Sequence, residues 1–166
     1  MKILFLARHF SYLRLFESAI RELAKRGHTI HLSADREESM GGRGMVERIA
    51  ADFPGVTVGW TPGREAGTWS ELARKLRLGL DYLRARSRER APMAVVVLAA
   101  LPGLRTTWGR RLLAAFLRGL ERSIPRSPEI DAFLRDQNPD LLLITPLIDL
   151  GSPQADHFAS ARAAGR

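Results

Sequence analysis

The first 34 residues constrain the fold more than any other part of the sequence. Residues 3–7 are all apolar, which is typical of a strand that is covered on both faces in a parallel sheet. Apolar residues then recur at intervals of three and four over 13–24, which predicts an amphipathic helix that ends at Gly27. Apolar and polar residues alternate over 29–34, which predicts a second strand. The segment therefore reads as a βαβ unit.

The rest of the chain extends this pattern into an α/β fold. Three valines within 91–101 favour a strand, but the position of this segment among helices favours a helix. The last strand, 140–145, is expected to be as deeply buried as the first and to lie beside it. We therefore expect a Rossmann-like parallel sheet in the order 3-2-1-4, with helices on both faces and an inserted set of basic helices before the fourth strand. The other expected elements are a helix over 45–53, a strand over 56–60, and helices over 68–88, 110–122, 128–138 and 152–162.

Size and composition narrow the class of protein. A chain of 166 residues, 45% of them apolar, fits a single domain over 1–166. Cysteine is absent, so disulfides and thiolate zinc sites are excluded and a cytoplasmic location is expected. The four His have no metal-ligand spacing, so no metal is expected. Residues 8–13 lack the glycines of a dinucleotide site, so no bound cofactor is expected.

Positive charge is concentrated in one segment. Residues 64–126 contain 14 Lys or Arg against 5 Asp or Glu, whereas the remainder of the chain is nearly neutral. Three interpretations remain open for the basic helices of this segment: a solvated face, a patch that meets an anionic membrane surface on the inner face of the membrane, or a face for nucleic acid. Nucleic acid is the least favoured of the three, because only 7% of the residues are aromatic and bases need stacking partners.

Candidate ligand-binding residues gather where the predicted strands end. Parallel sheets of this type bind ligands at the carboxyl edge, so the loops that follow the strands are the first place to look. A polar, glycine-rich stretch around 41–44 is expected to be a loop beside the one that follows the first strand. The candidates in these loops are Arg8, His9, Phe10, Ser11, Tyr12, Arg14, Gly41, Gly42, Gly44, Thr145 and Asp149.

Two segments resemble the amino-terminal domain of GT-B glycosyltransferases. Residues 1–7 and 16–28 read MKILFLA and FESAIRELAKRGH, similar to the strand and helix that open those domains. Residues 138–147 read NPDLLLITPL, similar to the strand that returns beside the first. The resemblance implies that this chain is the acceptor-binding half of a two-domain enzyme. A nucleotide-sugar donor would be bound by a carboxyl-terminal domain missing from the chain, and the acceptor is unknown.

The resemblance also implies a role for His9. In inverting members of the family, a His or Asp in the loop after the first strand is the general base that deprotonates the acceptor hydroxyl, and His9 lies in that loop. The remaining candidates would bind the acceptor, with Arg8 and Arg14 suited to an anionic group and Asp149 to a hydroxyl. Simpler roles stay open: Ser11 as a helix cap, and packing for the aromatic residues of the loop.

Other functions with the same fold are also open. One is a non-catalytic module that binds a ligand or a protein, and another is half of a sugar-nucleotide epimerase. Residues 164–166 resemble a helix end that precedes another strand, so we expect the chain to be a fragment that is inactive alone.

Overall fold

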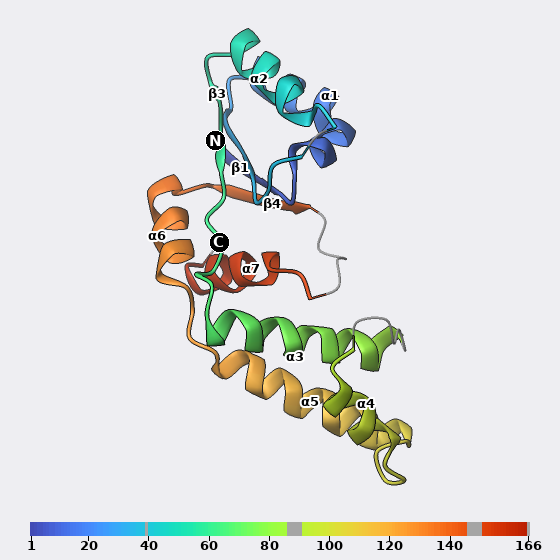
Figure 1. Ribbon diagram of the computed structural model, residues 1–166. Helices are drawn as coiled ribbons and strands as arrows, with labels where there is room; N and C mark the ends of the chain where they lie inside the picture. Colours follow the sequence, from blue (N-terminus) through green and yellow to red (C-terminus); the bar gives the residue numbers. More distant parts are fainter. Residues whose placement is uncertain (39, 86–90, 146–150, 166) are drawn as a thin grey trace. The chain divides into compact units, whose positions relative to one another are not determined.

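The computed structural model describes residues 1–38, 40–85, 91–145 and 151–165 (Figure 1). Contacts divide the chain into two compact units. The first, the sheet unit, comprises the described residues of 1–64, 126–147 and 154–166. The second, the helical unit, comprises those of 65–125 and 148–153. The inserted basic helices thus form a unit with its own core.

Four parallel strands form the sheet. They are β1 (Lys2–Ala7), β2 (Thr29–Ala34), β3 (Val56–Trp60) and β4 (Leu141–Thr145), in the order β3-β2-β1-β4. Phe5 of β1 is level with Leu32 of β2 and Leu143 of β4, so the two apolar runs of the sequence lie side by side. The predicted α/β class and the strand order 3-2-1-4 are both confirmed.

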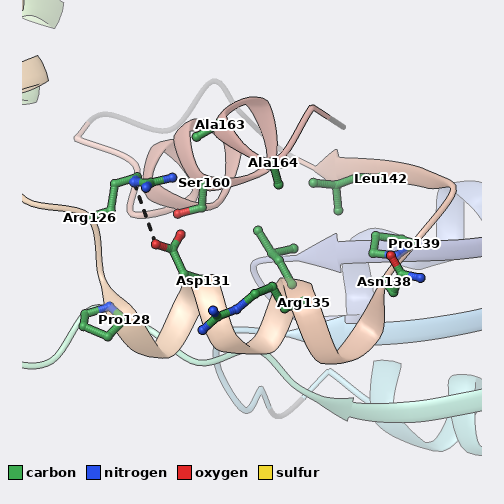
Figure 2. Close-up of a pocket in the computed structure, with 12 residues that line it drawn as sticks. Arg126, Pro128, Asp131, Arg135, Asn138, Pro139, Leu142, Ser160, Ala163 and Ala164 are labelled. Carbon is green, nitrogen blue, oxygen red and sulfur yellow. Dashed lines mark ion pairs between the residues drawn. The ribbon is translucent and has the colours of Figure 1, made fainter.

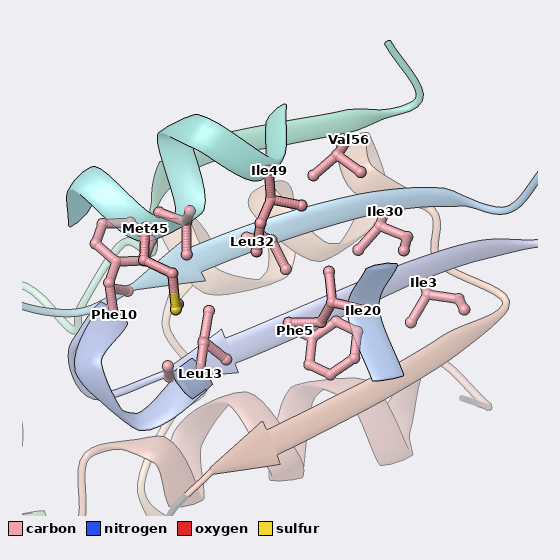
Figure 3. Packing of buried hydrophobic residues seen from close by; sticks show 13 residues of the cluster. Ile3, Phe5, Phe10, Leu13, Ile20, Ile30, Leu32, Met45, Ile49 and Val56 are labelled. Carbon is pink, nitrogen blue, oxygen red and sulfur yellow. The ribbon is translucent and has the colours of Figure 1, made fainter. Parts of the chain in front are cut away.

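One face of the sheet packs against η1 (Phe10–Phe16), α1 (Glu17–Lys25) and α2 (Gly42–Asp52). Phe5, Leu32 and Ile49 are among the buried side chains of this core (Figure 3). The helix predicted over 13–24 was wrong in its first turns, because residues 10–16 form a 3₁₀ helix instead. Phe10, Leu13 and Phe16 are spaced by three, which suits the three residues per turn of a 3₁₀ helix.

The opposite face packs against α6 (Pro128–Gln137) and α7 (Gln154–Ala163). Leu4 and Leu6 of β1 meet Ile130 and Leu134 of α6 in this second core. Pro128 occupies the first turn of α6, and Asn138 adopts the left-handed conformation at its end (φ 38°).

The burial predicted for the last strand was wrong. β4 is at the edge of the described sheet, and Leu141 and Leu143 are 41% and 37% exposed. The register places both on the same face as Ile3 and Phe5, the face that carries α1 and α2. An apolar run alone does not distinguish a central strand from an edge strand, which explains the error.

The helical unit contains α3 (Thr68–Ala85), α4 (Met93–Ala100) and α5 (Thr107–Ser123). The ambiguous segment 91–101 is therefore helical, as predicted. Leu76, Val95 and Leu117 are among the buried residues of its core. The Arg77 side chain links α3 to α5 through a 2.7 Å ion pair between its Nε and Glu121 Oε1, with both side chains largely buried.

Candidate functional site

Backbone hydrogen bonds join the strand ends at the carboxyl edge of the sheet. The amide of Arg8 donates to the carbonyl of Thr145 (3.2 Å), and the amide of Asp35 donates to the carbonyl of Ala7 (3.0 Å). The first residues after β1 and β2 and the last residue of β4 are consequently neighbours. The predicted candidates Arg8 and Thr145 are brought together here, whereas Asp149 lies outside the described residues.

His9, in the loop after β1, forms a pair with Ser11, in the first turn of η1. His9 Nδ1 and Ser11 Oγ are 2.7 Å apart, and the His9 ring lies 4.5 Å from the ring of Tyr12, measured between centroids. The Ser11 hydroxyl therefore partners His9, and Ser11 is not the cap of η1, because His9 is the residue that precedes this helix. In the tautomer that has its proton on Nδ1, the ring donates to Ser11 and Nε2 carries the lone pair that a general base requires.

The aromatic residues of this loop have packing roles. Phe10 is only 1% exposed, and its ring lies 5.3 Å from that of Trp60 at the end of β3. Tyr12 is half-buried and packs against the same core. The packing alternative therefore describes both side chains, and Phe10 is too enclosed to offer its ring to a ligand.

The glycine-rich segment contacts the loop after β1, as the sequence predicted. Gly41 adopts a left-handed conformation (φ 75°), and the Arg14 guanidinium donates to the carbonyl of Met40. The Gly42 amide donates to Glu38 Oε1 (2.6 Å). The expectation of a loop over 41–44 was wrong in part, because Gly42 and Gly44 belong to the first turn of α2.

Asp35 is a candidate that sequence reasoning missed. Its two carboxylate oxygens are buried, and neither has a hydrogen-bond partner among the described residues. Desolvation raises the pKa of this carboxyl from 3.8 to about 6, although Arg36 and Arg8 act in the opposite direction. An acidic residue directly after a strand at the carboxyl edge was the available signal.

Helix α7 brings polar groups to the same edge. Gln154 Nε2 donates to the carbonyl of Thr145 (3.2 Å), and His157 Nε2 lies 2.9 Å from the carbonyl oxygen of Pro62. Arg64 and Asp156 form an ion pair at 2.9 Å, with side chains only 11% and 9% exposed. Buried hydrogen bonds and charge therefore fix this helix, in addition to its apolar contacts.

A hollow in the sheet unit lies elsewhere. A pocket of about 530 Å³ lies between α6 and α7, where Asn138, Leu142 and Ser160 are among its lining residues (Figure 2). Arg126 and Asp131 face each other across a 3.8 Å ion pair at its rim. The lining runs along α6 from Pro128 to Asn138, so this pocket is on the face of the sheet that carries α6 and α7, and not on the face that carries η1.

The described part of the chain contains no cluster of three or more His, Asp or Glu side chains arranged to hold a metal ion. None of its helices is both long enough and apolar enough to cross a membrane.

Comparison with protein-family models, with curated proteins and with solved structures gave no match in any of the three. Function must therefore be inferred from the chemistry of the site.

Proposed function

We propose that this chain is the acceptor-binding domain of a GT-B type glycosyltransferase. The single observation that carries the proposal is the His9–Ser11 pair in the loop after β1, at the carboxyl edge of the sheet. A general base is required at this place because an acceptor hydroxyl is a weak nucleophile until its proton is removed. The strand order and the sequence resemblance support the same assignment.

Each neighbouring group has a part in the proposed reaction. Ser11 holds the His9 ring and its tautomer, so that Nε2 receives the proton of the acceptor hydroxyl as its oxygen attacks the anomeric carbon. Asp35 supplies carboxylate oxygens that lack partners among the described residues, and in this proposal a sugar or acceptor hydroxyl donates to them. In this proposal a second domain, outside residues 1–166, binds the nucleotide sugar.

The test uses the intact protein, purified with any sequence that adjoins this chain. Binding of the protein to each member of a panel of nucleotide sugars is measured by titration. Turnover is then measured as release of the nucleotide after a mixture of acceptors is added. We expect binding of at least one donor and a loss of turnover of about 100-fold or more in His9→Ala, with little change in donor affinity. Failure of every donor to bind would refute the proposal.

A matched control shows whether the loss of turnover is specific to His9 or follows the removal of any half-buried histidine. His28 precedes β2 at the amino edge of the sheet and is half-buried, as His9 is. His28→Ala should retain turnover within about twofold, because a surface substitution away from the site is nearly neutral. Turnover of a sugar nucleotide without any acceptor would instead identify an epimerase.

A further inference from the structure

The helical unit exposes an apolar stripe along α5. Trp108, Leu112 and Phe116 are 74%, 64% and 61% exposed, and their spacing of four residues places them on one side of the helix. Leu113 and Leu117, on another side of α5, are buried in the core of the unit. The core is thus already formed, and the stripe remains as a second apolar surface that the described residues of the unit do not cover.

A groove lined by arginine adjoins this stripe. It has a volume of about 450 Å³ and lies between α3 and α5. The Arg110 guanidinium donates to the carbonyl of Leu83 (3.2 Å), which holds its charge at the groove wall. Arg111 follows Trp108 by three residues, so groove and stripe meet along α5. The arginines that line it are Arg84, Arg105, Arg110, Arg111 and Arg118.

Ion pairs among the described residues do not neutralise the positive charge of these arginines. In the described part of the chain, the ion pairs of the helical unit use Lys75 with Glu71 and Arg77 with Glu121, and none involves a groove arginine. Five guanidinium groups around one hollow repel one another, and phosphate oxygens match the donor geometry of guanidinium. The groove is therefore suited to a phosphate-bearing partner.

We propose that the helical unit docks on the surface of an anionic lipid bilayer. Lipid phosphates occupy the arginine groove, while Trp108, Leu112 and Phe116 enter the boundary between headgroups and acyl chains. Nucleic acid would satisfy the arginines but would leave the apolar stripe in water, so the combination of charge with apolar side chains favours a membrane. This inference is independent of the proposed glycosyl transfer and concerns a different unit of the chain.

Charge reversal tests the groove. The full chain is sedimented with phosphatidylcholine vesicles that contain either no anionic lipid or about 30% phosphatidylglycerol, at about 50 mM and about 500 mM salt. We expect binding to the anionic vesicles at low salt only. Arg111→Glu combined with Arg118→Glu should weaken this binding by about tenfold or more. The control, Lys25→Glu with Arg48→Glu, changes net charge equally on exposed positions of the sheet unit and should weaken it by less than about threefold.

Truncation tests the stripe. Leu112→Ala combined with Phe116→Ala should lower partition onto anionic vesicles by about tenfold. The matched control, Leu15→Ala with Phe158→Ala, removes similar exposed side chains from the sheet unit and should have less than a twofold effect. In a Trp60→Phe and Trp69→Phe background, brominated lipid should quench the fluorescence of Trp108, which reports insertion directly.

Three outcomes would overturn the proposal. The first is no binding to anionic vesicles at low salt. The second is an equal loss in the groove and control variants, which would indicate nonspecific attraction by net charge. The third is tight binding of duplex DNA or RNA without any binding of the vesicles, which would assign the arginine groove to nucleic acid instead.

Discussion

Gly42 lies directly against the backbone of Ser11. A Cβ atom at position 42 would be 2.3 Å from the Ser11 amide nitrogen and 2.6 Å from the Phe10 carbonyl carbon, closer than real atoms approach. These are backbone atoms in the loop that also carries His9, so they cannot yield as a side-chain tip would. The absence of a side chain at position 42 therefore sets how closely α2 approaches the candidate site.

Gly42→Ala should destabilise the protein by about 3 kcal/mol, because either α2 or the loop after β1 must move to relieve the overlap. Urea unfolding followed by circular dichroism measures this change. Gly44→Ala is the matched control, since a Cβ there meets no atom within 4 Å and the position is helical. It should be neutral or stabilising by up to about 1 kcal/mol, and equal losses in the two variants would contradict the steric argument.

Part of the site could be predicted because its signals are local. The apolar run of β1 predicted a central strand, and topology then places the residues that follow, such as His9, at the carboxyl edge. The contact of Gly42 with Ser11 depends instead on the first turns of two helices that are about 30 residues apart in the chain, and no pattern in either segment specifies it. The partner of the His9 ring was likewise missed, since Ser11 has the same signature as a helix cap.

Ser11→Ala tests Ser11 as a positioning residue within the proposed glycosyl transfer. The substitution removes the hydroxyl that lies 2.7 Å from His9 Nδ1 and leaves the Nε2 base in place. Turnover should fall by about tenfold, because the ring would lose the hydroxyl that fixes its orientation toward the acceptor. Ser11→Thr should restore most of the turnover. A lower rate with no rescue by Thr, together with an equal loss of stability in urea unfolding, would indicate that Ser11 is merely structural.

Asp35→Asn tests the buried carboxyl through the pH dependence of stability. The folded-state pKa is raised to about 6 from 3.8, so the native state takes up a proton as the pH falls between these values. The contribution of this carboxyl to wild-type stability is therefore largest below about pH 4, and it is lost as the pH rises through about 6. Asparagine carries no charge, so the variant should be more stable than wild type by about 1–2 kcal/mol at pH 8, and this difference should disappear near pH 4. Urea unfolding at several pH values provides the measurement, and a pH-independent difference would contradict it.

The burial of α7 shows a further limit of sequence patterns. Gln154, His157 and Ser160 are among the most buried residues of this helix, while Phe158 is half exposed. An apolar stripe normally indicates the buried side of a helix, and here polar residues occupy it. Their partners, such as the Pro62 carbonyl, are distant in sequence, so the helix could be predicted but its orientation could not.

Arg64→Ala tests whether the buried ion pair holds α7 in place. Arg64 Nη2 lies 2.9 Å from Asp156 Oδ1, and removal of the guanidinium would leave the carboxylate of Asp156 in a poorly solvated position. We expect a loss of about 3 kcal/mol in urea unfolding, and the double variant Arg64→Met with Asp156→Leu should recover much of it because no charge remains to be buried. Arg26→Ala is the control, since its pair with Glu22 has a similar 2.9 Å distance but is mostly exposed, and it should cost about 0.5 kcal/mol or less. A double variant that is less stable than Arg64→Ala would contradict this expectation. It would indicate that the two side chains stabilise α7 through their other hydrogen bonds and not only by neutralising each other's charge.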